Sequence, residues 1–320
     1  MFGKKEGIKQ GMQKSTYTWK NIGTAGIILI VIFGLLCIPF YSVIDDGYFY
    51  GKLLTRQKQL AMEKENTIDC FFVGASEVWA SYAPLQFYHE QGFTSYNLGT
   101  VGLWAGDLPT VMKYSLRTQH PKLIVLDANC LYTDVVEGSY AFMKVFPLFH
   151  FHEYFMNVSG GPVKASDEKG VYLNDTVKPY TGRRDYMNAV TDLYPMRDLN
   201  QKYLNEFLQT CKEENIELLM VNVPTSLNWT LGKEKAIQQW CTANNVPYVD
   251  YNTNEKSQEI GLDWNTDTRD AGDHLNVSGT KKFDTALGKL IQEKYSLNDH
   301  RSDPSYAQWE KNYQNVKFYQ

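Results

Sequence analysis

The sequence lacks several features that would direct its interpretation. Its five cysteines form no CxxC or CxxH spacing, so nothing indicates a cysteine-bound metal. Basic charge is not in excess, because 32 Lys and Arg stand against 36 Asp and Glu, which gives no electrostatic case for nucleic-acid binding. With 43% hydrophobic and 21% charged residues, the composition is that of a globular protein. The 320 residues suffice for one large domain or two small ones.

One long segment near the N-terminus lacks charge altogether. Residues 21–44 lie between Lys20 and Asp45, and a helix of this length crosses a hydrocarbon core of about 30 Å. A cleaved signal peptide would have a shorter apolar region and a small-residue cleavage site. Lysines precede the segment and aspartates follow it, which predicts a cytoplasmic N-terminus at 1–20, a transmembrane anchor at 21–44 and an extracytoplasmic remainder.

The remainder alternates short apolar runs with amphipathic segments. Residues 45–66 have helical spacing and are interpreted as a stalk or first helix. Five runs predict strands, each followed by a helix, and together they indicate an α/β fold with a parallel sheet: 67–74, 94–99, 122–129, 216–223 and 246–251. The aromatic, irregular segment 131–195 is interpreted as an insertion within a domain of residues 67–295. The polar tail 296–320 is compatible with docking or with disorder.

Polar or small residues follow the strand ends. Ser76, Gly99, Asn129 and Thr225 each lie just past a predicted strand, and the site of an open α/β sheet lies outside the carboxyl ends of its strands. These residues can therefore converge.

Ser76 allows two interpretations. In "DCFFVGASEVW" it follows a small-residue turn, as an exposed nucleophile or as a helix cap. A nucleophile needs a base, and His274 stands in the acid-rich loop "DTRDAGDHLNVSGTKKF" before the last helix, where the alternative is a surface loop that caps a helix. His150 and His152 could form a metal pair, but no acidic cluster lies beside them. We expect no metal and no cofactor.

At these residues the chain resembles the SGNH (GDSL-like) hydrolases. "FFVGASEVW", "SYNLG" and "HLNVSGTKKF" are similar to segments of membrane-anchored members of bacterial cell envelopes, which include teichoic-acid D-alanyl-transfer and alginate O-acetylation proteins. The resemblance covers about residues 66–295. It implies a three-layer α/β/α flavodoxin-like fold with five parallel strands.

The resemblance also implies roles for individual residues. Ser76 would be the nucleophile and one oxyanion donor, Gly99 and Asn129 would be further oxyanion donors, and His274 would be the base. The first block has Ala75 and Glu77 around the serine in place of the usual residues, and the third reads Asp127-Ala128-Asn129-Cys130.

The acid partner of His274 is left open by the resemblance, because Ala271 occupies the usual position. Asp273 is adjacent to His274 and would point away from it in an extended loop, while Asp267 is seven residues distant. Asp270 can reach the ring through one tight turn, with Gly272 free to adopt a positive φ. We therefore predict Asp270 as the acid, with Asp273 and Asp267 as alternatives.

The resemblance implies an extracytoplasmic serine acyltransferase or esterase that acts on O-acyl groups of a cell-envelope glycan or teichoic acid. It also implies a membrane-bound O-acyltransferase as a partner. The alternative is a catalytically inactive SGNH-like module that binds glycan or serves as a scaffold.

Overall fold

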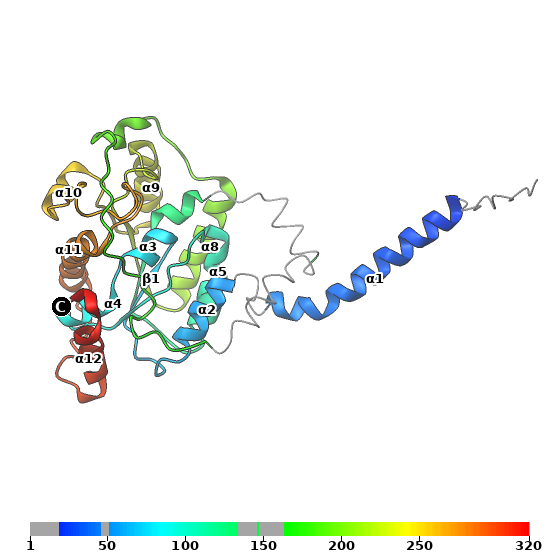
Figure 1. Cartoon of the computed structure of the whole chain (residues 1–320), viewed down its shortest axis with the longest axis horizontal. Coiled ribbons are helices and arrows are strands. Elements are labelled where there is room, and N and C mark those ends of the chain that lie inside the picture. Colours follow the sequence, from blue (N-terminus) through cyan, green and yellow to red (C-terminus); the bar gives the residue numbers. More distant parts are fainter. Residues whose placement is uncertain (1–18, 46–50, 134–145, 147–162, 320) are drawn as a thin grey trace, which may run out of the picture.

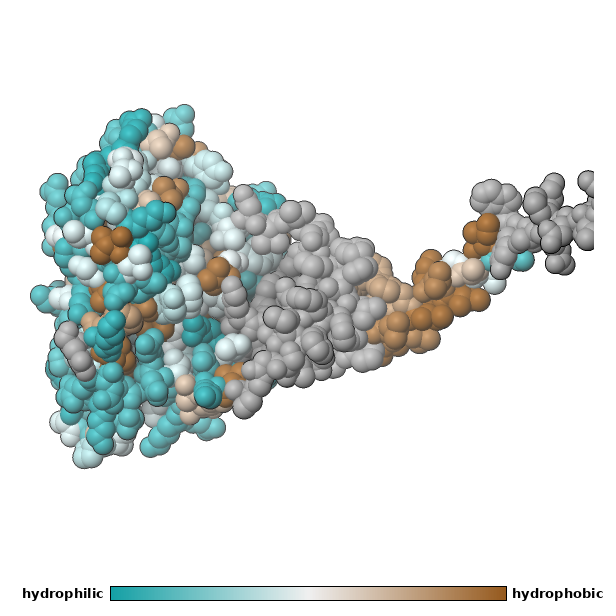
Figure 2. Space-filling model, in the orientation of Figure 1, coloured by the Kyte–Doolittle hydropathy of each residue, from teal (hydrophilic) through white to brown (hydrophobic). Residues whose placement is uncertain are grey.

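The computed structural model describes residues 19–45, 51–133, 146 and 163–319. His150, His152 and much of the predicted insertion lie outside these residues. Helix α1 (Trp19–Asp45) projects from the α/β domain and forms the brown, projecting part of the surface in Figure 2. Its segment Asn21–Ile38 has a mean hydropathy of 2.5 and is the part of the described chain that is long and apolar enough to cross a membrane. A signal sequence near the N-terminus would have the same length and composition.

The sheet has five parallel strands in the order β2-β1-β3-β4-β5, which confirms the predicted α/β class. The strands are β1 (Cys70–Val73), β2 (Ser95–Asn97), β3 (Leu123–Asp127), β4 (Glu217–Asn222) and β5 (Tyr248–Asp250). Phe72 of β1 lies opposite Asn97, and Val73 opposite Leu126. The carboxyl ends of the central strands are therefore level, and the loops that follow them begin at one edge.

Helices cover both faces of this sheet (Figure 1). Alternate strand residues such as Phe71 and Ile124 pack into one buried cluster with residues of α2, α5, α8 and α9, whereas Phe72 and Val125 pack into another with α11. Burial on both faces explains why the strands are apolar throughout. The helices are α2 (Gly51–Leu60), α3 (Ser76–Ala80), α4 (Pro84–Gln91), α5 (Leu108–Ser115), α8 (Asp198–Glu213), α9 (Leu231–Asn244), α10 (Asn254–Glu259), α11 (Val277–Tyr295) and α12 (Ala307–Asn315).

The segments flanking the predicted domain pack against it. Leu60 of α2 is buried, and the Ser115 hydroxyl donates to the Gln57 side chain at 3.0 Å, so this helix is part of the domain. In the tail, α12 packs on α4, where the rings of Tyr88 and Trp309 lie 5.5 Å apart. The tail therefore docks on the domain. All five cysteines are buried free thiols.

Candidate active site

Ser76 is the first residue of α3, at the edge where the strands end. The capping residue of this helix is Ala75, which makes no side-chain hydrogen bond, so the interpretation of Ser76 as a cap is wrong. Gly74 is required in the turn because a Cβ there would collide with the Val78 side chain. The Ser76 Oγ lies 3.4 Å from the Oε2 of Glu77.

Asp270 binds His274 through two contacts. Its backbone N–H donates to Asp270 Oδ1 at 2.7 Å, and its Nδ1 lies 2.5 Å from Asp270 Oδ2. The intervening turn has positive φ at Gly272 (101°), as expected, and also at Ala271 (67°). The geometry agrees with the pairing predicted from the sequence. It leaves Nε2 of this largely buried ring without a hydrogen-bond partner among the described residues.

The charges around the ring make the imidazole more basic. Burial lowers the pKa of His274, but the hydrogen bond to Asp270 and the negative charges of Asp273 and Glu77 outweigh it, so the pKa is raised above 6.5. Burial likewise opposes the shift of Asp270, whose pKa is nevertheless lowered by its bonds to His274. An ionised Asp270 holds the proton on Nδ1, and Nε2 is then free to accept one.

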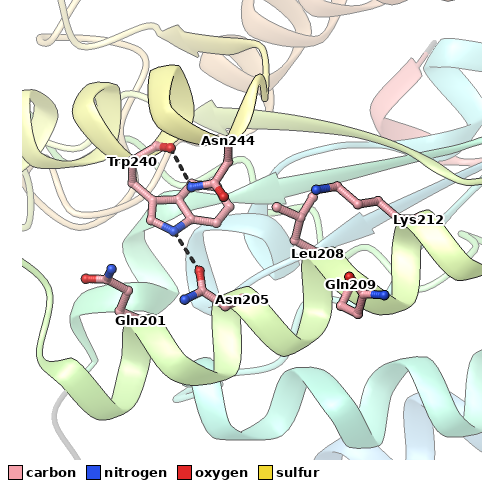
Figure 3. Close-up of a pocket in the computed structure, with 7 residues that line it drawn as sticks. All are labelled: Gln201, Asn205, Leu208, Gln209, Lys212, Trp240 and Asn244. Atoms are coloured by element: carbon pink, nitrogen blue, oxygen red, sulfur yellow. Dashed lines mark hydrogen bonds between the residues drawn. The ribbon is translucent and has the colours of Figure 1, made fainter.

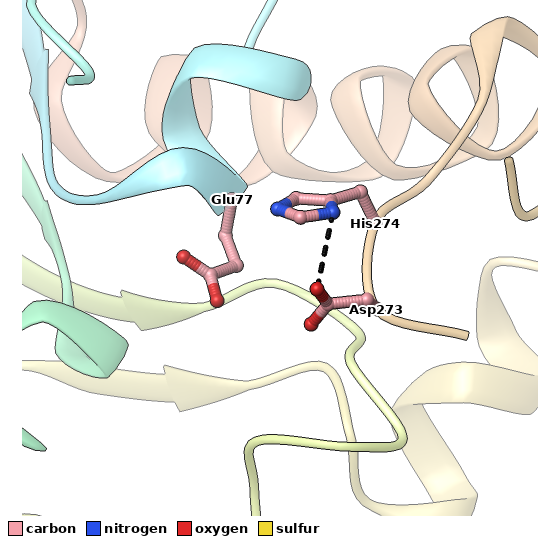
Figure 4. A group of neighbouring side chains, drawn as sticks. All are labelled: Glu77, Asp273 and His274. Carbon is pink, nitrogen blue, oxygen red and sulfur yellow. Dashed lines mark ion pairs between the residues drawn. The ribbon is translucent and has the colours of Figure 1, made fainter. Parts of the chain in front are cut away.

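The two alternative acids lie differently with respect to the ring. Asp273 Oδ2 lies 3.5 Å from His274 Nδ1, so the expectation that Asp273 points away from His274 is wrong (Figure 4). Asp267 is fully buried away from the ring: it binds the Lys282 ammonium at 2.7 Å and accepts a hydrogen bond from the Ser278 hydroxyl at 2.8 Å. Asp267 therefore fixes the start of α11, which Asn276 caps.

Glu77 and Asn228 join the site, and sequence analysis gave neither of them a catalytic role. The Asn228 amide nitrogen donates to Glu77 Oε1 at 3.2 Å and to Asp273 Oδ1 at 2.5 Å. It therefore bridges α3 and the loop of residues 267–273, here called the acid loop. Burial raises the pKa of Glu77. The only sequence signal for Asn228 was its place in the loop after β4.

The predicted oxyanion donors differ in whether their N–H groups already donate to another residue. The Asn129 side-chain nitrogen is buried and has no partner in the described part of the chain. The expectation for Gly99 needs correction, because its N–H donates to the Asn97 side chain at 2.9 Å. A Cβ at Gly99 would collide with the backbone of Trp79, so this glycine permits close packing of the loop under α3. Thr225 is buried, and its N–H donates to Asn252 at 2.7 Å.

Asp127 lies fully buried beneath these loops. Its carboxylate accepts hydrogen bonds from the N–H of Asn129 (3.0 Å), the N–H of Val223 (2.9 Å) and the hydroxyl of Tyr82 (2.9 Å). Burial, together with the charge of Glu77, raises its pKa to about 7. Asp127 thus ties the Asn129 turn to the end of β4.

Three side chains in the described part of the chain lie close enough together to hold a metal ion. The ligand atoms of Glu77, Asp273 and His274 lie within 4.8 Å of one another. However, Asn228 already bonds both carboxylates, and Asp270 holds Nδ1 of the ring. The absence of a metal requirement stays a prediction.

A polar groove lies elsewhere, between α8 and α9 (Figure 3). The Trp240 indole at its wall donates to Asn205 at 2.9 Å, and the Asn244 amide donates to the Trp240 carbonyl at 2.8 Å. No residue of the candidate site lines this groove.

No family model matches the chain. No curated protein matches it either. Among solved structures it is similar to the acetyl xylan esterase AlAXEase, with 17% identity over 70% of this chain and all of that one, at a TM-score of 0.40. It is also similar to a GDSL-like lipase from Bacteroides thetaiotaomicron, with 14% identity over 76% of this chain and 98% of that one, at a TM-score of 0.40. At such distances, the function has to be argued from the residues of this chain.

Proposed function

We propose that this protein is a serine esterase or acyltransferase that forms an acyl-enzyme on Ser76. The observation that carries the proposal is the Asp270–His274 pair, which leaves Nε2 without a partner in a ring that lies within 4.8 Å of the carboxylate of Glu77, the residue after Ser76. A serine hydroxyl needs such a base, and the base needs a carboxylate to fix its tautomer.

The chemistry would proceed in two steps. The Ser76 Oγ attacks the acyl carbon and its proton passes to His274 Nε2, which then protonates the departing alcohol. Water or an acceptor hydroxyl attacks the acyl carbon of the acyl-enzyme and gives its proton to Nε2. The bond from that carbon to the Ser76 Oγ breaks, and Nε2 returns the proton to this Oγ. The Asn129 amide and the Ser76 N–H, in the first turn of α3, would stabilise the oxyanion.

The substrate class and location rest on the resemblance and on α1. We propose O-acyl groups of a cell-envelope glycan or teichoic acid, with α1 as an anchor and the domain on the extracytoplasmic side. A membrane-bound O-acyltransferase would supply the acyl group if the reaction is a transfer.

One observation favours the alternative of an inactive module. The Ser76 hydroxyl contacts the Glu77 carboxylate at 3.4 Å, and no hydrogen bond between Ser76 and His274 is present. Such bonds often tighten only when substrate binds. A fluorophosphonate probe separates the two functions, because it labels only an activated serine. The full-length chain in detergent should be labelled, and Ser76→Ala should not; an unlabelled wild-type protein would support the inactive module.

A further inference from the structure

A pair of stacked aromatic rings lies beside Ser76. The rings of Trp79 and Tyr172 are almost parallel, at 7°, with centroids 4.5 Å apart. Trp79 follows Ser76 by three residues in α3, and residues at this spacing share a helix face. The pair is therefore next to the proposed nucleophile.

The chain holds Tyr172 in an exposed position. Its neighbours Val171 and Leu173 are both buried, and Tyr172 itself is 44% exposed. This alternation is typical of an extended segment with one face on the core. The Tyr172 N–H donates to the Trp79 carbonyl at 2.8 Å, which fixes the segment against α3. Tyr172 is thus displayed by anchored backbone.

The same segment borders the acid loop. The Lys178 N–H donates to the Thr268 carbonyl at 2.9 Å, and the Ala271 N–H donates to the Lys178 carbonyl at 3.1 Å. Arg269 connects the rings to Asp270, because its guanidinium carbon lies 5.6 Å from both ring centroids and its Nε lies 3.9 Å from Asp270 Oδ2. The rings therefore border both the serine and the acid.

We propose that Trp79 and Tyr172 form a sugar-binding platform that places an O-acylated pyranose ring against Ser76. This inference rests on the proposed function and specifies its substrate as a glycan. An aromatic face packs against the C–H groups of a sugar ring, while the polar edge formed by Arg269, whose Nη1 has no hydrogen-bond partner in the described chain, suits its hydroxyl groups. A long acyl chain has no groups for that polar edge to bind.

Binding tests the platform independently of catalysis. An O-acetylated xylo-oligosaccharide is titrated into full-length Ser76→Ala, with tryptophan fluorescence as the readout, and then into Ser76→Ala combined with Tyr172→Ala. We expect the second substitution to weaken binding roughly fivefold to tenfold, and Tyr172→Phe to preserve it. Tyr194→Ala is the matched control, because Tyr194 is 50% exposed and also lies near another ring, Tyr132, and a lysine.

Turnover by variants that retain Ser76 separates this inference from the proposed function. Tyr172→Ala should lower kcat/KM for the oligosaccharide mainly through KM and leave p-nitrophenyl acetate within about twofold. Equal losses on both esters, a loss selective for p-nitrophenyl octanoate, or an equal effect of Tyr194→Ala would each overturn the platform. Wild-type protein that binds the oligosaccharide but cleaves neither ester would refute the esterase and leave the platform intact.

Discussion

At the scale of single residues, the decisive pair is Asp270 and His274. Asp270→Asn removes the charge that fixes the imidazole tautomer, and we expect a fall in kcat of about 10³- to 10⁴-fold. Asp273→Asn and Asp267→Asn should cost far less, because those carboxylates are bonded to Asn228 and Lys282. Ester hydrolysis by equally folded variants measures this. A wild-type rate in Asp270→Asn beside a collapse in Asp273→Asn would reassign the acid.

The charges around His274 also set a pH dependence. Because they raise its pKa above 6.5 despite burial, the acid limb of the kcat/KM profile should lie above pH 6.5. Asp273→Asn removes one of these negative charges and should move the limb to lower pH. A limb that does not respond to this substitution would mean that another group titrates. Asp303→Asn is an electrostatic control, since the Asp303 carboxylate accepts the Ser305 N–H at 2.8 Å in the C-terminal tail.

The effect of Asp127 on catalysis can be separated from its effect on stability. Asp250 is its structural match: it also ends a strand, and it accepts the N–H of the residue two positions on, Asn252, at 2.8 Å. Both asparagine variants lose buried hydrogen bonds, worth about 1–3 kcal/mol in stability. Only Asp127→Asn releases the turn that carries Asn129. We expect kcat to fall with little change in KM for Asp127→Asn, and to be unchanged for Asp250→Asn.

At the scale of elements, α3 and the loop under it determine where the serine lies. The backbone of Trp79 approaches Gly99 so closely that a Cβ cannot fit, and the Asn97 amide holds the carbonyls of Val78, Ser81 and Tyr82 at 2.6–3.0 Å. Gly99→Ala should therefore displace α3 and lower both activity and stability. Gly102→Ala is the control, because no atom lies within 4 Å of the Cβ that it adds, although the φ of +78° at Gly102 adds strain. Equal denaturation midpoints and rates in wild type and Gly99→Ala would contradict the packing.

The elements themselves were largely predictable from the sequence, whereas their contacts were not. Strands buried on both faces are continuous apolar runs, so all five were located. Asp270 was predictable because a turn of known geometry joins it to His274. Asn228 could not be predicted, because its partners Glu77 and Asp273 lie 151 and 45 residues away in the chain. Gly99 was assigned a donor role by the resemblance, but the asparagine two residues earlier accepts its N–H in a local turn that Asn side chains commonly form.

At the scale of the whole molecule, buried carboxyls give stability an unusual pH dependence. The pKa of Asp127 is raised to about 7 and that of Asp250 to about 6, mainly by burial. An unfolded aspartate releases its proton near 3.9. Between these values the folded state binds more protons, so the free energy of unfolding falls as pH rises from about 4 to about 7. Urea denaturation should give a higher midpoint at pH 5 than at pH 8, and Asp127→Asn should reduce the difference.

Topology and metal content are also properties of the whole chain. A reporter fused after residue 60 should show export; a cytoplasmic signal there would remove the envelope as the site of action. Treatment with a chelator should leave ester hydrolysis unchanged. Loss of activity that zinc restores would indicate that Glu77, Asp273 and His274 hold a metal ion.

The short connection between α1 and the domain limits where the domain can act. Helix α1 ends at Asp45 and α2, which packs on the domain, begins at Gly51. The five residues between them span at most about 18 Å when fully extended. If α1 lies in a bilayer, the domain is tethered at the membrane surface and samples only a thin layer above it. A polymer would then be modified as it passes through this layer, and its distant parts would escape.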